Sequence, residues 1–251
     1  MNWIPFAIAG AFAQLVDGIV GMGFGVTSTT ILLVLGASAS MASAAVHLAE
    51  IGTTLASGIS HWHKENVDLN ILRKLAIPGG IGAFLGATLL SSIDLTQGKT
   101  FVSTILLLLG FVLIYRNIFS NTSAMNLTDI KQRGYLSFLG FTGGFVDASG
   151  GGGWGPVVTP TLLTTTSTEP KKVIGTVSAS EFIVAICASV AFLINLSRVG
   201  IDWSVVFGLA AGGILMAPLA AHFVGRVSGR TLGIIIGSAI VFINGFKLLG
   251  L

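Results

Sequence analysis

The chain has 251 residues, of which 53% are hydrophobic and only 9% are charged. A soluble domain carries about 25% charged residues, so this composition excludes a water-soluble globular protein and indicates an integral membrane protein. The formal net charge of +3 arises from basic residues between apolar segments, which is typical of membrane topology rather than of nucleic-acid binding. Since Cys187 is the single cysteine, an intrachain disulfide is excluded.

Eight apolar stretches follow one another along the chain, and most have the roughly 20 residues that a membrane-spanning helix needs. They cover residues 3–35, 43–62, 75–93, 101–119, 134–165, 173–196, 203–224 and 231–249. The stretches 3–35 and 134–165 are too long for one span, and glycines interrupt both in the middle. We expect each to form a hairpin of two shortened helices, either re-entrant or crossing the membrane twice.

The two long stretches are copies of each other. A shift of 130 residues places Asp17 on Asp147, and it aligns four glycines and one threonine in the same way. After one inserted residue, a shift of 131 places Glu50 on Glu181. The chain is therefore predicted to be a duplicated unit, with a first repeat over 1–120, a linker over 121–133 and a second repeat over 134–251.

Basic residues indicate how the repeats cross the membrane. If each half is a hairpin plus three spans, ten lysines and arginines share one side, and Lys99, Arg198 and Lys247 lie on the other. If the first stretch of each half crossed only once, the split would be eight to five. The positive-inside rule favours the hairpin model, with both termini outside and the linker in the cytoplasm.

In this model the two halves have opposite orientations, as in many secondary transporters. The expected fold is an all-α integral membrane protein with two inverted repeats, each a glycine-broken helical hairpin plus three transmembrane helices. The expected location is an inner membrane of the bacterial type.

The glycine-rich breaks are the strongest indication of a binding site. Irregular backbone at membrane depth is tolerated only where it is buried in protein or lines a cavity. If a helix restarts after the glycines, its first N–H groups and its dipole favour an anion, without any lysine or arginine. The expected substrate-binding residues are Gly21, Gly23, Gly25, Thr27, Thr29, His47, Gly151, Gly153, Gly155 and Thr159. The alternative is that the glycines only allow tight helix crossing.

Four acidic residues lie inside apolar stretches as two repeat-related pairs: Asp17 with Asp147, and Glu50 with Glu181. A carboxylate in the hydrocarbon region is costly, and such residues usually mark pathways, proton relays or paired partners. We expect these four, together with Ser178, to serve in proton coupling or structural support. Asp17 and Asp147 could instead cap the broken helices.

His47 lies three residues before Glu50, so both project from one helical face. It is a candidate donor to the substrate, half of a proton relay, or an interior histidine without function. A metal site would need more ligands of this kind, and the repeat partner of His47 is Ser178, so no metal and no cofactor are expected. Because the sequence lacks the hydrolase motifs Gly-x-Ser-x-Gly and His-Glu-x-x-His, an enzyme is not expected.

Several features together resemble one known family. They are the glycine motifs after Asp17 and Asp147, the basic segment 66–73 followed by Ile77-Pro78, the Gly82/Gly86 and Gly213/Ala217 pairs, and the loop 226–230. Over essentially its whole length the chain resembles the sulfite exporter TauE/SafE family of membrane permeases.

The resemblance implies transport of small sulfur-containing anions such as sulfite, sulfonates or sulfoacetate, driven by the proton gradient through alternating access. It fixes neither the substrate nor the direction. A passive anion channel and a non-transporting intramembrane enzyme or partner subunit remain alternatives. The sequence also leaves open whether the protein forms a homo-oligomer in the lipid bilayer.

Overall fold

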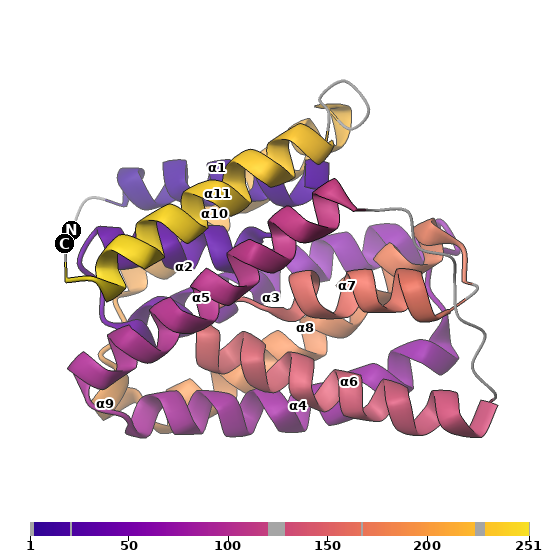
Figure 1. Ribbon diagram of the computed structural model, residues 1–251, viewed down its shortest axis with the longest axis horizontal. Coiled ribbons are helices and arrows are strands. Elements are labelled where there is room, and N and C mark those ends of the chain that lie inside the picture. Colours follow the sequence, from indigo (N-terminus) through magenta and orange to yellow (C-terminus); the bar gives the residue numbers. More distant parts are fainter. Residues whose placement is uncertain (1–2, 21, 120–128, 167, 224–228, 251) are drawn as a thin grey trace.

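The computed structural model describes residues 3–20, 22–119, 129–166, 168–223 and 229–250, and within these ranges all regular secondary structure is helical. The helices are α1 Ile4–Val20, α2 Phe24–Val34, α3 Ala39–His63, α4 Leu69–Ser92, α5 Leu95–Ile118, α6 Asp129–Gly150, α7 Trp154–Thr165, α8 Pro170–Ile194, α9 Leu196–Val199, α10 Trp203–Phe223 and α11 Gly229–Leu248. The start of α1 and the end of α11 lie at the same end of the bundle, opposite the C-terminal ends of α5 and α10 (Figure 1).

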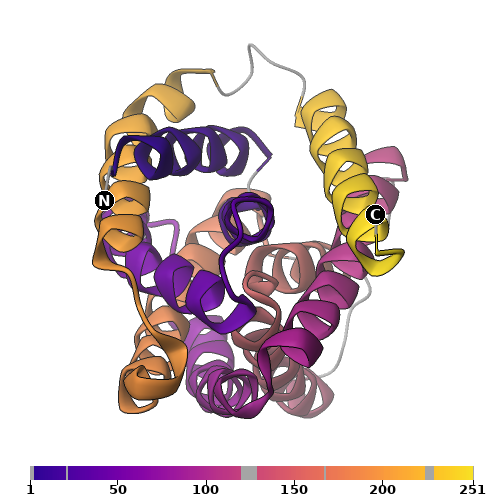
Figure 2. The same cartoon turned by 90° about the vertical axis from the view of Figure 1, so that its left-hand side faces the viewer.

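Each long apolar stretch is divided at its glycines. The first becomes α1 and α2, and the second becomes α6 and α7. Viewed from the end that carries the termini, α2 lies near the middle of the molecule, with the longer helices around it (Figure 2). The short helices that follow the breaks are therefore placed where the protein, rather than lipid, surrounds them.

Several helices begin earlier than the apolar runs predicted, because polar residues cap them. Ser38, Asp68 and Asp94 accept hydrogen bonds from backbone N–H groups in the first turns of α3, α4 and α5. Side-chain acceptors at these positions satisfy donors that a helix start leaves free. The helices consequently start at residues 39, 69 and 95 instead of 43, 75 and 101.

The second half differs from the prediction in two further places. Helix α6 begins at Asp129, inside the predicted linker 121–133; the linker residues 121–128 lie outside the described part of the chain. The short helix α9 was not predicted and precedes Gly200, which has a left-handed backbone conformation with a φ of 64°. Four residues are too few to give a recognisable pattern of hydrophobic side chains.

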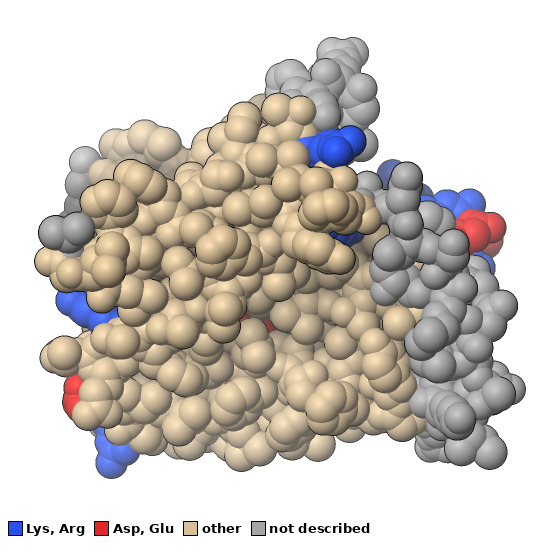
Figure 3. Space-filling view, in the orientation of Figure 1, with Lys and Arg blue, Asp and Glu red and all other residues tan. Residues whose placement is uncertain are grey.

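The outer surface has the character of a membrane protein. Among the described residues, four helical segments are long and apolar enough to span a bilayer: Leu69–Ser92, Leu95–Ile118, Lys171–Ile194 and Arg230–Leu248. Large apolar side chains stand exposed, including Phe207 at 65% and Leu215 at 75%. On the face shown in Figure 3, charged residues lie mainly toward the two ends of the long axis, and the broad middle carries only a small recessed acidic patch. A patch this large requires lipid around it, so the protein is a multi-pass membrane protein.

Glycines set the distance between α4 and α6. Gly82 and Gly86 lie against the α6 backbone, where a Cβ on Gly86 would be 2.5 Å from the carbonyl oxygen of Phe145. Small residues spaced by four allow helix backbones this close together in membranes. The packing role expected for this glycine pair therefore fits the structure.

The corresponding contact in the second half is displaced by one residue. Gly212, rather than Gly213, lies against the backbone of α1, at Ala7. Gly213 instead faces the side chains of Thr53 and Phe24. The sequence repeat identified the helix correctly but not the residue in contact.

The α4–α6 contact predicts opposite effects for two similar substitutions on α6. Gly144→Ala should lower the thermal unfolding midpoint in detergent, because its Cβ would overlap the backbone of Gly79 and overpacking costs about 1–3 kcal/mol. Gly134→Ala should leave the midpoint unchanged or raise it, since the added Cβ meets no atom within 4 Å and alanine favours a helix. Equal midpoints for the two variants would contradict this packing.

Candidate functional site

At the centre of the molecule, the starts of α2 and α7 pack directly on each other. A Cβ on Gly25 would lie 2.6 Å from the Cα of Gly152, and a Cβ on Gly155 would lie 2.9 Å from the Cβ of Met22. Gly25 and Gly155 occupy equivalent places in the two repeats, as do Met22 and Gly152. The two contacts are therefore reciprocal, and we call the region where they meet the junction.

Glycine is required at the junction for two reasons. Gly23 and Gly152 both have a φ of 139°, and Gly151 has a φ of 74°, conformations that side chains rarely adopt. In addition, a Cβ on Gly151 would lie 2.5 Å from Cγ2 of Thr29. The Thr29 hydroxyl donates a hydrogen bond to the Gly151 carbonyl, which joins the two halves. Gly21 lies outside the described residues.

Asp17 and Asp147 hold the helix starts that follow them. Oδ1 of Asp147 accepts hydrogen bonds from the backbone N–H groups of Gly153 at 2.7 Å and Trp154 at 3.0 Å. Oδ1 of Asp17 accepts one from the N–H of Phe24 at 3.4 Å. A carboxylate is favourable at the positive end of a helix dipole, so both aspartates occupy the capping position that the sequence left open.

A buried network joins His47 to the same aspartate. Nδ1 of His47 is 2.8 Å from the Ser43 carbonyl oxygen, and Nε2 is 3.1 Å from Oδ2 of Asp147. A carbonyl oxygen can only accept, so Nδ1 carries a hydrogen. The contact between Nε2 and the carboxylate then needs a further proton, held by one partner or the other. The two side chains of this pair, which links the two repeats, therefore share one proton.

Glu50 lies beside both features. One carboxylate oxygen, Oε1, would be 3.2 Å from a Cβ on Gly25, and the other, Oε2, is buried with no hydrogen-bond partner in the described part of the chain. His47, Glu50 and Asp147 each offer one ligand atom, and these atoms lie within 4.8 Å of one another. The three side chains could pass a proton between them or hold a metal ion.

A cavity of about 30 Å³ connects the remaining predicted acids. It is lined by Gln14, Asp17, Phe24, Glu50, Thr53, Thr54, Ser57, Ser178 and Glu181. The Ser178 hydroxyl donates to the Ser57 hydroxyl at 2.7 Å. A space of this size suits water rather than a sulfur oxyanion. Gln14, Thr53, Thr54 and Ser57 were not predicted, because polar uncharged residues are common in helices and none stood out in the repeat.

Three buried hydroxyl groups near the junction lack a partner among the described residues. They belong to Thr27 and Ser28 on α2 and to Thr159 on α7. Buried polar groups without partners are rare in native proteins, and they often mark a place for water or a ligand. Thr27 and Thr159 were predicted site residues.

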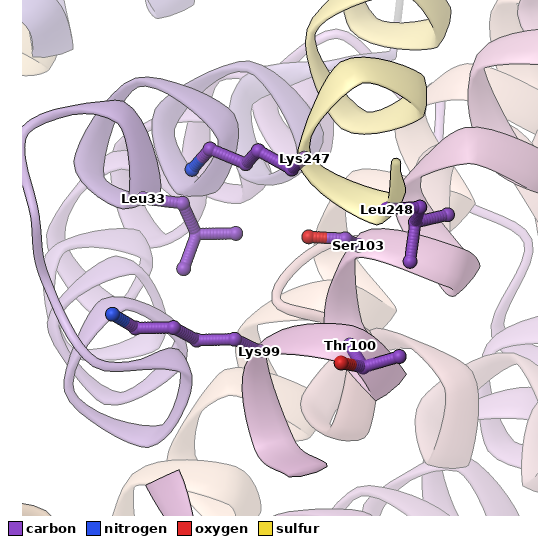
Figure 4. Close-up of a pocket in the computed structure, with 6 residues that line it drawn as sticks. All are labelled: Leu33, Lys99, Thr100, Ser103, Lys247 and Leu248. Atoms are coloured by element: carbon purple, nitrogen blue, oxygen red, sulfur yellow. The ribbon is translucent and has the colours of Figure 1, made fainter. Parts of the chain in front are cut away.

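A larger cavity, of about 250 Å³, lies near the end of α2 and the chain's C-terminal helix. Lys99 of α5 and Lys247 of α11 line it, together with Leu33, Thr100, Ser103 and Leu248. Figure 4 shows that both lysine side chains extend in the same direction, past Leu33. In the sequence analysis these two lysines served only to assign the sides of the membrane. No pattern in the sequence predicted that α5 and α11 would place them on one cavity.

Arg116 was also missed. It stands in the last turn of α5, and its guanidinium contacts the sulfur of Met22, the residue that packs on Gly155. The expectation of a site without lysine or arginine therefore differs from the structure, which brings one arginine to the edge of the junction.

Comparison with known proteins agrees with these features. The model of the family described as "Sulfite exporter TauE/SafE" matches residues 6–246. The chain belongs to the TauE/SafE sulfite exporter family. The resemblance inferred from the glycine motifs is thereby confirmed.

Relatives of this TauE/SafE protein are named as transporters. The "Probable membrane transporter protein YtnM" of Bacillus subtilis is 46% identical over 242 residues, which cover 96% of this chain and 81% of the relative. A "Probable membrane transporter protein" of Haemophilus influenzae is 28% identical, over 89% of this chain and 85% of its own. No solved structure matches the chain. The family and these names confirm a membrane transporter rather than an enzyme.

The two roles of Asp147 predict different results for two substitutions. Asp147→Asn keeps an oxygen for the N–H groups of Gly153 and Trp154, so the fold should persist, but the proton shared with His47 is lost and transport should fail. Asp147→Leu should also lose the helix cap, at a cost of about 0.5–2 kcal/mol or more. Thermal unfolding and anion uptake in proteoliposomes measure the two effects separately. Wild-type uptake by Asp147→Asn would contradict the role of the shared proton.

Proposed function

We propose that this TauE/SafE family protein carries a small sulfur-containing anion, of the sulfite, sulfonate or sulfoacetate type, across the membrane in exchange with or together with protons. The observation that carries the proposal is the junction, where two helix starts meet at the centre of an all-helical membrane protein. Helix N-termini at this depth are suited to an anion.

The capping aspartates suggest how protons and the anion are coupled. An ionised Asp147 and a sulfur oxyanion would compete for the same N–H groups, those of Gly153 and Trp154. When the aspartate takes up a proton, its negative charge no longer repels the anion and its hold on these donors weakens. Binding of the anion is thereby linked to binding of a proton. Glu50 and Glu181, which line the adjoining cavity, would exchange this proton with one side of the membrane.

The reciprocal contacts support an inverted repeat. Gly25 on Gly152 repeats as Gly155 on Met22, and α1 on α10 repeats as α6 on α4. Such an arrangement gives two nearly equivalent states that face opposite sides, which is the basis of alternating access. Arg116 in the last turn of α5 and Arg230 in the first turn of α11 lie side by side, and they favour a cytoplasmic location for that end of the bundle.

The close packing of the junction favours a carrier over a passive channel. A channel needs a continuous water-filled path, whereas the residues on both sides of the junction are buried and the adjoining cavity is small. A carrier that encloses its substrate needs no such path in any one state. Accumulation of the anion against its own gradient separates the two mechanisms.

Uptake of a labelled sulfonate into proteoliposomes tests the proposal, because the charge of a sulfonate does not change near neutral pH. The wild type should take up and concentrate the anion faster when a proton gradient is imposed, and Glu50→Gln should lose this acceleration. Glu169→Gln is the control, because Glu169 lies on the surface, paired with Lys171. Absence of flux for sulfite and for sulfonates would overturn the proposed function. An uptake rate that is the same with and without the proton gradient would overturn the proposed coupling to protons.

A further inference from the structure

Arg116 carries a charge that the described part of the chain does not balance. The two ion pairs found there are His47 with Asp147 and Lys171 with Glu169. The guanidinium is partly buried, and the contact found for it is the Met22 sulfur. A thioether is a weak acceptor, while a guanidinium has five N–H donors. A partly buried arginine without an acceptor is costly, and a charged residue within a membrane helix usually marks a functional site.

A structural role at the end of α5 does not explain the position of this side chain. Arginine near a helix C-terminus often donates to the last carbonyl groups. Here Arg230 of α11 donates to the carbonyl of Ile118 at 3.2 Å, and Asn117 donates to that of Leu113 at 2.8 Å. Other side chains thus donate to the carbonyl groups at the end of α5, and Arg116 extends toward the junction instead.

The surroundings of Met22 suit an anion. Met22 precedes Gly23, the N-cap residue of α2, and packs on Gly155 in the first turn of α7. The Thr27 hydroxyl oxygen, which is buried and has no partner among the described residues, would be 3.9 Å from a Cβ on Gly23. Arg116 and the start of α7 therefore both contact Met22. The start of α2 and the Thr27 hydroxyl follow within five residues, and a methionine side chain is flexible enough to move aside.

We propose that Arg116 binds the transported anion, with its guanidinium donating to two oxygens of a sulfite or sulfonate group beside Met22 and Thr27. The proposal deepens the proposed function and rests on it for the role in transport, while binding itself can be measured without flux. The planar guanidinium of arginine can donate two parallel hydrogen bonds to two oxygens of the same anion. The ammonium group of lysine cannot form this pair of bonds. The arginine also supplies the positive charge that a site next to Asp17, Glu50 and Asp147 otherwise lacks.

Equilibrium binding of labelled sulfite and labelled sulfoacetate to the purified full chain in detergent tests the assignment. Arg116→Gln and Arg116→Met should weaken binding about tenfold or more, since a hydrogen bond to a charged group is lost. Arg116→Lys should retain part of the affinity because it keeps the charge. Arg73→Gln on α4 is the matched control: it removes an exposed arginine and should bind as the wild type does.

The variants also separate a packing role from anion binding. If Arg116 only filled space against Met22, Arg116→Met would bind as tightly as the wild type and Arg116→Lys would not, which would overturn the proposal. Equal binding by Arg116→Gln and wild type, or no binding of either anion to the wild type, would also overturn it. Binding that depends on Arg116 in a protein without flux would support the site and refute the transport function, so the two failures are distinguishable.

Discussion

The contact between two glycine-broken helices is the constraint on which the rest of the structure depends. Gly25 lies on Gly152, and Gly155 lies on Met22, so even one added methyl group would separate the two halves. This contact fixes where α2 and α7 begin, and it brings the side chains that follow Asp17 and Asp147 to one place. The longer helices around it, held at close range by glycines such as Gly86, keep lipid away from its backbone.

Burial of acidic residues beside this contact is the main energetic cost of the arrangement. Asp17, Glu50, Asp147 and Glu181 lie around the junction and its cavity, with one buried imidazole among them. Backbone N–H groups and His47 offset part of that cost for Asp147, whereas Oε2 of Glu50 has no partner among the described residues. Such a cluster is stable only when protons or bound ions neutralise part of its charge. That requirement is what makes the site sensitive to the proton gradient in the proposed function.

Much of the fold could be predicted from the sequence, because lipid imposes strict rules on helix length and backbone pairing. The positions of both breaks and the burial of Glu50 and Asp147 followed from apolar periodicity and the internal repeat. Gly152 escaped notice because Met22 stands in its place in the first repeat. The pairing of His47 with Asp147, 100 residues apart, and the reach of Arg116 to Met22 depend on how helices pack across the two halves, which local patterns do not encode. Helix starts were misplaced where Ser38, Asp68 and Asp94 extend helices beyond the apolar runs.

In the proposed function the transported anion binds at the junction. Selenite is the heavier analogue of sulfite, and its selenium can be located in crystals of the protein by anomalous diffraction. If the anion binds at the junction, a selenium peak should appear where α2 and α7 begin, in contact with the residues around Met22 and Gly155. A peak found only at the exposed basic residues near the ends of the bundle, with none at the junction, would contradict it.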